Sequence, residues 1–360
     1  MTITTTAEKA TMRDSDSMTN GLVLSRRRFI GSCCVAGGFA GASLLSTGAR
    51  LRGGMFLFGS GGGDDEPFFE IRKLKPGLIA IYNGGGNAVV FRDLKSGKSV
   101  LSDCKLAHLG YTLRREIEAA GYQLEKVINT HHHLDHTGGN YAFNGDLELI
   151  AHKNLTPRVR EQVDTAKQRA LESVGSLTGN GAAGDGKWVK EKMATISGDD
   201  FVPDTEVSSS ELEVKVGEEG VVELRYVTNG HTDNDMFLRY PTMNAIHTGD
   251  LLFHGLHPFI DVKAGASTRG WQKCVREIIA VCDSETVVVP GHGEVTDVTG
   301  LKKQDQYFDQ LREVVMRARK SGKSRSEIAQ MKPGVFEGRG FEPLLSRNLG
   351  VVFDELEQEG

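Results

Sequence analysis

The sequence predicts an α/β protein in which two β-sheets pack face to face and helices cover both outer faces, giving four layers. Three observations predict this fold. Short runs of β-forming residues occur in two batches, and each batch ends in helical segments. Hydrophobic residues make up 39% and charged residues 25% of the 360 residues, which is typical of a soluble globular chain. No short internal repeat appears.

The first batch of strands begins at Phe68 and is separated by glycine, proline and aspartate. Strands are predicted at residues 68–73, 78–82, 88–92, 99–101, 126–130 and 147–151. Helices are predicted at 113–120, 140–143 and 154–174. The glycine-rich stretch 175–200, which carries Trp188, predicts mostly a long loop that is either a lid over a site or a plain surface loop.

The second batch has the same layout. Strands are predicted at residues 212–216, 221–227, 236–240, 245–247 and 286–289. Helices are predicted at 268–281, where the pattern is amphipathic, and then at 301–319, 324–331 and 344–358. These helices can cover the outer face of the second sheet.

Residues 1–52 are typical of an export signal and not of a folded segment. Arg26 and Arg27 precede a glycine-rich apolar run from Phe29 to Ser46, and the cluster resembles the bacterial twin-arginine signal. The run is too short and too rich in glycine for a membrane-spanning helix, so we expect no stable span in the mature chain. The expected location is the periplasm or cell envelope. Residues 53–66, glycine-rich and then acidic, predict a linker, and 67–360 one folded domain.

Charge is distributed unevenly along the chain. Residues 1–52 hold seven basic and three acidic side chains, so the remainder, with 36 basic and 45 acidic, has a net charge of −9. An acidic body argues against a non-specific nucleic-acid binder, because neutralising phosphates needs a basic face. Beyond the signal, Cys104, Cys274 and Cys282 are an odd number without Cys-x-x-Cys spacing, which predicts buried free thiols.

The strongest motif follows the strand predicted at 126–130, where four histidines and one aspartate stand within six residues. Side chains two apart in an extended chain point the same way, so His131 and His133 can converge while His132 faces away. As the chain turns into a helix, Asp135 and His136 can reach a second point nearby. Imidazole and carboxylate are ligands for zinc and other first-row metals.

Three more ligand-type residues stand in glycine-bearing turns, each directly after a predicted strand. They are His231, Asp250 and His292. A single histidine after a strand is usually structural, but this ordered set, combined with the histidine cluster, predicts a metal site at one edge of the sheets.

The ordered set His-x-His-x-Asp-His, Gly-His-Thr, Thr-Gly-Asp and Pro-Gly-His-Gly resembles the metallo-β-lactamase superfamily over about residues 68–300. The resemblance implies an αβ/βα sandwich with the metals at the edge of the two sheets. It implies that His131, His133 and His231 hold a first metal and that Asp135, His136 and His292 hold a second, with Asp250 bridging. Asp at position 250, where lactam-hydrolysing members often have Cys, implies a ligand set like that of glyoxalase II, the lactonases and the nucleases.

The expected activity is therefore metal-dependent hydrolysis by a hydroxide that bridges two divalent ions, zinc first, with iron or manganese suiting the same donors. Asp135 would orient the hydroxide and accept its proton. His254 and His257, four and seven residues after Asp250, are further catalytic candidates, for an oxyanion or a leaving group, or else ordinary loop histidines. His247 is expected in the core or beside the ligands.

The expected substrate is a small molecule with an ester, lactone, thioester or amide bond, and no nucleic-acid partner is expected. Three alternatives stay open. One is an iron-dependent redox enzyme on the same fold, although the di-iron flavoprotein pattern has Glu where His133 stands. The others are a phosphodiesterase or nuclease, and a non-catalytic metal-binding protein with a relic site.

Overall fold

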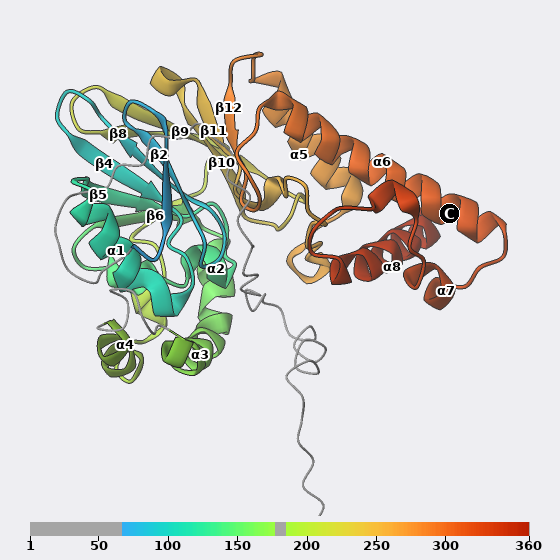
Figure 1. Cartoon of the computed structure of the whole chain (residues 1–360), viewed down its shortest axis with the longest axis horizontal. Helices are drawn as coiled ribbons and strands as arrows, with labels where there is room; N and C mark the ends of the chain where they lie inside the picture. The colour runs from blue at the N-terminus through green and yellow to red at the C-terminus, as the bar shows by residue number, and fades with distance from the viewer. Residues whose placement is uncertain (1–66, 177–184, 360) are drawn as a thin grey trace, which may run out of the picture. The chain divides into compact units, whose positions relative to one another are not determined.

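Seven strands form the first sheet of the computed structural model, which describes residues 67–176 and 185–359 (Figure 1). In order across the sheet they are β1 (Glu70–Lys75), β2 (Leu78–Tyr82), β3 (Ala88–Arg92), β4 (Lys98–Ser102), β5 (Gln123–Ile128), β6 (Glu148–His152) and β7 (Thr205–Val207). β1 to β4 pair antiparallel, whereas β4 to β7 pair parallel. The parallel strands require crossovers, and helices supply them.

Five strands form the second sheet, in the order β12 (Val287–Val289), β11 (Ala245–His247), β10 (Asp235–Tyr240), β9 (Gly220–Val227) and β8 (Glu211–Val216). Only β11 and β12 pair in parallel. The inner faces of the two sheets share one apolar core, which includes Val89, Ile128, Leu238 and Val289.

Helices cover the outer face of each sheet, so the predicted four-layer sandwich is confirmed. The first sheet packs against α1 (Gly110–Ala119), α3 (Leu155–Ser173) and α4 (Asp185–Met193). The second packs against α5 (Thr268–Ala280) and α6 (Val298–Lys320). The short α2 (Leu134–Thr137) lies just after β5. None of the helices in 67–176 and 185–359 is long and apolar enough to cross a bilayer.

The C-terminal helices α7 (Arg325–Ala329) and α8 (Pro343–Gln358) pack with α5 and α6 around the same core. Arg312 of α6 is buried there. Its guanidinium donates to Thr268 Oγ1 at 3.1 Å and Glu355 Oε2 at 3.0 Å, and it also pairs with Glu359. These bonds join α5, α6 and α8 through one side chain.

The structure differs from the sequence prediction mainly between 175 and 207. Helix α4 occupies part of the predicted loop, because Val189 and Met193 reach the core beside α3. Trp188 of α4 contacts the ring of Tyr111 on α1, on the outer helical layer. Strand β7 was not predicted, since it has three residues and only Val207 is buried. The predicted signal (1–52) and linker (53–66) lie outside the described residues.

Candidate metal centre

The His131–His136 segment follows β5 and is fixed by hydrogen bonds at its start. The amide of Thr130 donates to Asp103 Oδ1 at 2.8 Å, and the Asn129 side chain donates to Asn140 Oδ1 at 3.0 Å. α2 then carries Asp135 and His136. The first sheet therefore supplies four of the seven predicted ligands from one short segment.

The second sheet supplies the other three predicted ligands. His231 lies between β9 and β10, Asp250 in a short 3₁₀ helix (Gly249–Leu251) after β11, and His292 after β12. Backbone bonds join the two halves here. The amide of Met236 in β10 donates to the Thr130 carbonyl at 2.8 Å, and the amide of Asn87, just before β3, donates to the carbonyl of Gly291, beside His292, at 2.7 Å. The two sets of donors therefore meet where the sheets pack.

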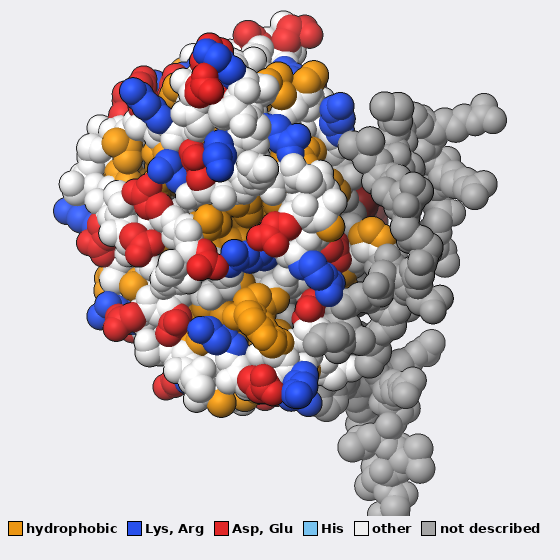
Figure 2. All heavy atoms as spheres, turned by 90° about the vertical axis from the view of Figure 1, so that its left-hand side faces the viewer, with side chains coloured by type: hydrophobic (Ala, Val, Ile, Leu, Met, Phe, Trp, Pro, Cys, Tyr) orange, Lys and Arg blue, Asp and Glu red, His pale blue; other side chains and the backbone are white. Residues whose placement is uncertain are grey.

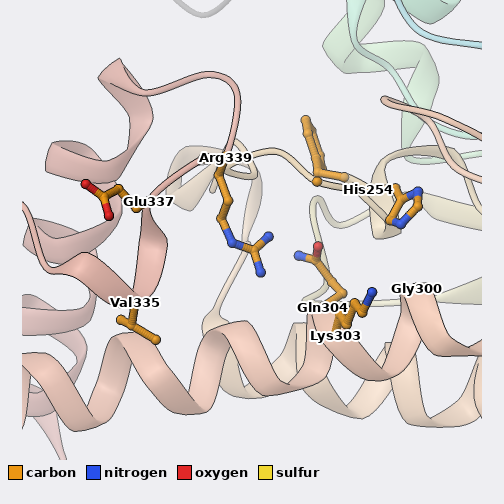
Figure 3. Close-up of a pocket in the computed structure, with 10 residues that line it drawn as sticks. His254, Gly300, Lys303, Gln304, Val335, Glu337 and Arg339 are labelled. Atoms are coloured by element: carbon orange, nitrogen blue, oxygen red, sulfur yellow. The ribbon is translucent and has the colours of Figure 1, made fainter.

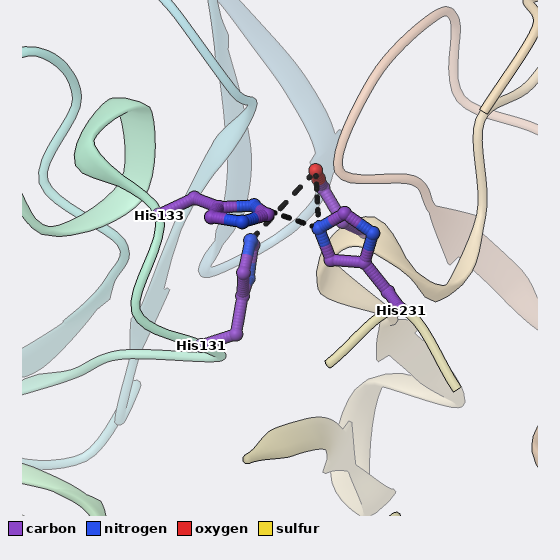
Figure 4. A group of neighbouring side chains, drawn as sticks. His131, His133 and His231 are labelled. Carbon is purple, nitrogen blue, oxygen red and sulfur yellow. Dashed lines mark hydrogen bonds and ion pairs between the residues drawn. The ribbon is translucent and has the colours of Figure 1, made fainter. Parts of the chain in front are cut away.

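One group of donors comprises His131, His133, His231 and Asp250, whose ligand atoms all lie within 4.8 Å of one another (Figure 4). His231 Nε2 lies 2.8 Å from His133 Nδ1 and 3.4 Å from Asp250 Oδ2. His131 Nε2 lies 3.7 Å from the same carboxylate oxygen. Three imidazole nitrogens and one carboxylate thus point at a common position.

A second group comprises Asp135, His136 and His292, again within 4.8 Å. His292 Nε2 lies 3.2 Å from Asp135 Oδ2. Asp250 stands between the two groups, since its Oδ1 lies 3.1 Å from His136 Nε2 and its Oδ2 lies 3.3 Å from His292 Nε2. The structure therefore brings all seven predicted ligands together, with Asp250 facing both groups.

The chemistry of this cluster fits divalent cations. His131 Nε2, His136 Nε2 and Asp250 Oδ1 are buried and form no hydrogen bond of good geometry among the described residues, although the last two atoms lie 3.1 Å apart. Buried polar atoms left unpaired are costly, so such an arrangement needs a further partner. Nitrogen and carboxylate donors suit zinc, iron or manganese.

Four imidazoles are oriented by a hydrogen bond at the ring nitrogen that faces away from the cluster. His136 Nδ1 lies 2.7 Å from Asp103 Oδ2, and His133 Nε2 lies 3.0 Å from Asp261 Oδ2. His231 Nδ1 lies 2.9 Å from the carbonyl oxygen of Phe259, and His131 Nδ1 lies 3.1 Å from a Thr130 hydroxyl that itself donates to Asp103. An imidazole that donates outward keeps its other lone pair for a metal.

Asp103 and Asp261 were not predicted from the sequence. Asp103 directly follows β4, and this strand-end position was a signal that could have found it. Asp261 stands 128 residues from His133 and has no such signal. Asp103 also faces His247 Nε2 at 3.3 Å, which places His247 beside the ligands, as expected.

Burial and charge set the protonation of these groups. Burial lowers the pKa of His131 well below its usual range and that of His231 to about 3, so both rings are neutral and can act as ligands at neutral pH. Burial alone would raise the pKa of Asp103, but the facing His136 lowers it to about 2. The three carboxylates of Asp103, Asp135 and Asp250 raise the pKa of His136 despite burial. They therefore favour positive charge at this position.

Close backbone approach around the cluster depends on glycine. A Cβ on Gly86 would lie 2.1 Å from His136 Cε1, and a Cβ on Gly139 would lie 2.0 Å from the carbonyl oxygen of Cys104. The buried Lys105 holds Gly86 in position by donating from Nζ to its carbonyl at 2.6 Å. Burial lowers the pKa of this ammonium to about 7.

His132 is turned to a different neighbour, as the alternation predicts, because its Nδ1 lies 2.9 Å from the Asn234 amide nitrogen. His132, His133 and Asp261 do form a third set of close donors. The 3.0 Å bond between His133 and Asp261 accounts for that set without an ion.

The structure does not bring His257 together with the predicted ligands, because its contacts lie elsewhere. Its ring is buried, with Nδ1 2.8 Å from the Tyr307 hydroxyl and its edge against Phe336. The loop turns after His254, so that His257, seven residues after Asp250, faces the C-terminal helices. His254 is half-buried and closer to the site, because its amide donates to the His292 carbonyl at 2.9 Å. Cys104 is a buried free thiol.

The sequence of the chain is similar to one known protein family. Residues 81–292, more than half of the chain, match the family model described as Metallo-beta-lactamase superfamily. No curated protein sequence matches the chain.

Solved structures share the fold at low identity. DIM-1 metallo-beta-lactamase is 17% identical with a TM-score of 0.51, over 68% of this chain and 98% of that one. The metallo-beta-lactamase from Pontibacter korlensis is 15% identical with a TM-score of 0.50, over 67% and 99%. The sec-alkylsulfatase Pisa1 from Pseudomonas sp. is 17% identical with a TM-score of 0.56, over 80% of this chain and 50% of that one. At these identities the likeness concerns the fold.

Proposed function

The chain belongs to the metallo-β-lactamase superfamily, and on that premise we propose that it is a hydrolase that uses two divalent cations to cleave a small acyl substrate. The observation that carries the proposal is the position of Asp250 between the donor groups: its Oδ2 lies 3.4 Å from His231 Nε2 of the first group, and its Oδ1 lies 3.1 Å from His136 Nε2 of the second. A carboxylate between two groups of donors can contact a cation held by each group.

We assign the donors as the sequence predicts. His131, His133 and His231 hold one cation, Asp135, His136 and His292 hold the other, and Asp250 contacts both. Zinc is the expected metal, and iron or manganese suits the same donors. When bound, such cations polarise a substrate oxygen and lower the pKa of water toward neutrality.

The cluster opens toward solvent on one side. The side chains of His133, Asp135 and His292 are 14%, 13% and 11% exposed, whereas those of His131, His136 and His231 are at most 1% exposed. Substrate would therefore approach beside Asp135. The facing His292 and His136 lower the pKa of Asp135 against the effect of burial, so its carboxylate is ionised and can orient a water and take a proton.

His254 is proposed as a substrate contact on the same side of the site. Its Nδ1 lies 2.8 Å from the carbonyl oxygen of Glu294, which orients the ring beside the His292 loop. Because Nδ1–H donates to this carbonyl, the ring faces a substrate with Nε2, which accepts a hydrogen bond when it carries no proton and donates one to an oxygen that develops negative charge only when it is protonated.

A small substrate fits the charges better than a nucleic acid. Residues 53–360 have a net charge of −9, with 36 basic and 45 acidic side chains. A centre with two divalent cations, the carboxylates of Asp135 and Asp250 and one hydroxide would keep about one positive charge. Figure 2 shows a face on which acidic and basic side chains are mixed. That face offers a polyanion no continuous basic patch and the net charge of the domain repels it, whereas one compact negative charge would be attracted to the centre.

The first test is elemental analysis of the purified protein together with a hydrolysis panel. We expect about two cations per chain, and hydrolysis of an ester, lactone, thioester or amide that stops on chelation and returns on adding metal. The panel includes single-stranded nucleic acid with matched metal as the comparison.

Three outcomes would contradict the proposal. One cation or none in a fully loaded protein would rule out the two-cation site. Efficient nucleic-acid cleavage that falls steeply with salt would favour a nuclease. Iron with redox activity and no hydrolysis would favour the oxidoreductase alternative.

A further inference from the structure

A cavity of about 300 Å³ lies beside the metal centre, between the loop after Asp250, helix α6 and the segment 335–339 (Figure 3). Its walls include Phe253, His254, Lys303, Gln304 and Arg339. None of these is among the seven predicted metal ligands. The volume is at the lower end of the range for small-molecule sites.

Gln304 gives this cavity an unpaired buried donor. Its side chain is 2% exposed, and its Nε2 has no hydrogen-bond partner among the described residues. In Figure 3 the amide points toward the Arg339 guanidinium across the cavity. Two donor groups that face each other across a gap are complementary to an acceptor placed between them.

Arg339 has no carboxylate partner within 67–176 and 185–359. Its guanidinium lies over the Tyr307 ring at 4.8 Å and donates one weak bond, at 3.4 Å, to the Leu256 carbonyl. Burial without a counter-charge lowers its pKa. A half-buried guanidinium usually pairs with an anion, because the charge is costly to desolvate.

The other charges of the cavity favour a small anion. Lys303 is exposed and lines the cavity on the His254 side of Gln304, whereas the Glu337 carboxylate points away from Arg339 in Figure 3. Two cationic side chains therefore line the cavity, and the one carboxylate in its lining is directed elsewhere.

The cavity is separated from the metal donors by one residue layer. The Phe253 ring lines the cavity and stacks on His292, with ring centroids 4.9 Å apart and planes at 22°. His254, in the same wall, donates its amide to the His292 carbonyl at 2.9 Å. A molecule held here would lie beside the loop that carries one ligand of the second group.

We propose that this cavity binds a compact anion, such as the carboxylate, phosphate or sulfate group of a small molecule, between Arg339, Gln304 and Lys303. Arg339 would donate a charge-assisted pair of hydrogen bonds and Gln304 Nε2 one more. The anion is either the acid group of the substrate, in which case this inference rests on the proposed hydrolase function, or a separate small acid that binds next to the centre.

The binding test uses the full-length, metal-loaded protein titrated with acetate, phosphate and sulfate by calorimetry. Arg339→Gln should weaken binding of the best anion by about 10-fold or more, and Gln304→Leu several-fold, because each loses a buried donor. Arg339→Lys should recover part of the loss. Arg317→Gln is the control, since Arg317 is 69% exposed and pairs with Glu313, and should bind as the parent does. Melting temperatures of all variants show whether each folds.

Parent-like affinity in folded Arg339→Gln would overturn the site, and so would an equal loss in Arg317→Gln. An anion that binds to the metal cations instead should keep its affinity in Arg339→Gln. Such binding therefore cannot produce the loss expected for that variant. This readout does not depend on turnover, so it decides on the cavity even if the proposed hydrolase activity fails.

Kinetics then identify the source of the anion. If it is the substrate's acid group, Arg339→Gln should raise KM for acid-bearing acyl substrates and leave neutral ones unchanged, and the free anion should compete. If it is a separate acid, the anion should change turnover of both substrate types in the parent and of neither in Arg339→Gln. Either result supports the cavity as an anion site.

Discussion

Asp250 differs from the other donors because its carboxylate lies close to both groups. Its side chain is 3% exposed, it lies 3.1 Å from His136 Nε2, and it lies 3.4 Å from His231 Nε2. The other six predicted ligands each belong to one of the two groups, His131, His133 and His231 to the first and Asp135, His136 and His292 to the second. The two groups therefore depend on this residue more than on any single histidine.

Replacing Asp250 with Ala should lower the hydrolysis rate by roughly 10²–10³-fold, the scale of losing one preorganised electrostatic contact. His132→Ala is the matched control, because His132 lies in the same cluster of histidines but bonds with Asn234. Steady-state rates, metal content and melting temperature should be measured for both. Equal losses of rate at unchanged metal content and folding would mean that the facing of these side chains is misassigned.

Gly86 limits the space around His136. An added methyl group would come within 2.1 Å of the ring, whose other side is held by Asp103. Gly86→Ala should therefore displace His136 and weaken the second cation by about 10–100-fold, as loss of a supporting contact does. Metal titration of the chelated protein measures this effect.

Gly175→Ala is the control for that substitution, because nothing lies within 4 Å of a Cβ added at 175. It should bind both cations as the parent does. If Gly86→Ala loads two cations with unchanged affinity, then His136 either moves without cost or is not a ligand.

At the scale of elements, the three longest helices of the second half depend on one buried charge. Arg312 is 3% exposed, and its guanidinium bonds with side chains from α5 and α8. Removing a buried cation of this kind is costly, because its carboxylate partners then lose their counter-charge.

Arg312→Met should lower the free energy of unfolding by about 3 kcal/mol, since the half-buried Glu355 would lose its counter-charge and keep only its hydrogen bonds from Thr268. Arg317→Met, on the same helix, removes an exposed pair with Glu313 and should cost at most about 0.5 kcal/mol. Urea unfolding of the two variants compares them directly. Similar midpoints would show that α8 is held by its apolar face alone.

The elements also show what the sequence could and could not predict. The bounds of β2, β3 and β11 match the prediction residue for residue, because apolar runs there end at Asn, Asp or Thr. β7 and α4 were missed because β7 depends on pairing with β6, and α4 on packing beside α3, and neither on a local pattern. For the site, the seven candidate ligands could be predicted, because His and Asp stand in turns directly after predicted strands. Asp261 and Lys105 could not, since folding brings their partners from elsewhere in the chain.

At the scale of the whole molecule, the first 52 residues and the rest of the chain differ in charge. Residues 1–52 hold seven basic and three acidic side chains, whereas the rest has 36 basic and 45 acidic. A short basic segment followed by a glycine-rich apolar run is what an export receptor reads. We therefore propose that the folded domain works outside the cytoplasm, in the periplasm or cell envelope.

Export should remove the N-terminus and leave a mature chain that starts between about Ala49 and Asp65. Arg26→Lys with Arg27→Lys should retain the precursor, because a receptor that reads the arginine pair loses its geometry. Cell fractionation and N-terminal sequencing in the native host check both statements. Intact Met1 on a cytoplasmic protein would contradict the signal assignment.

The donors of the metal centre come from both sheets, and this fixes when in the life of the chain the centre can exist. A chain that has formed only its first sheet holds the four donors between His131 and His136 but lacks His231, Asp250 and His292. Contacts between such distant parts of a sequence form late in folding. We therefore expect metal uptake to be one of the last steps of maturation, so that a loaded centre marks a chain whose two halves have already docked.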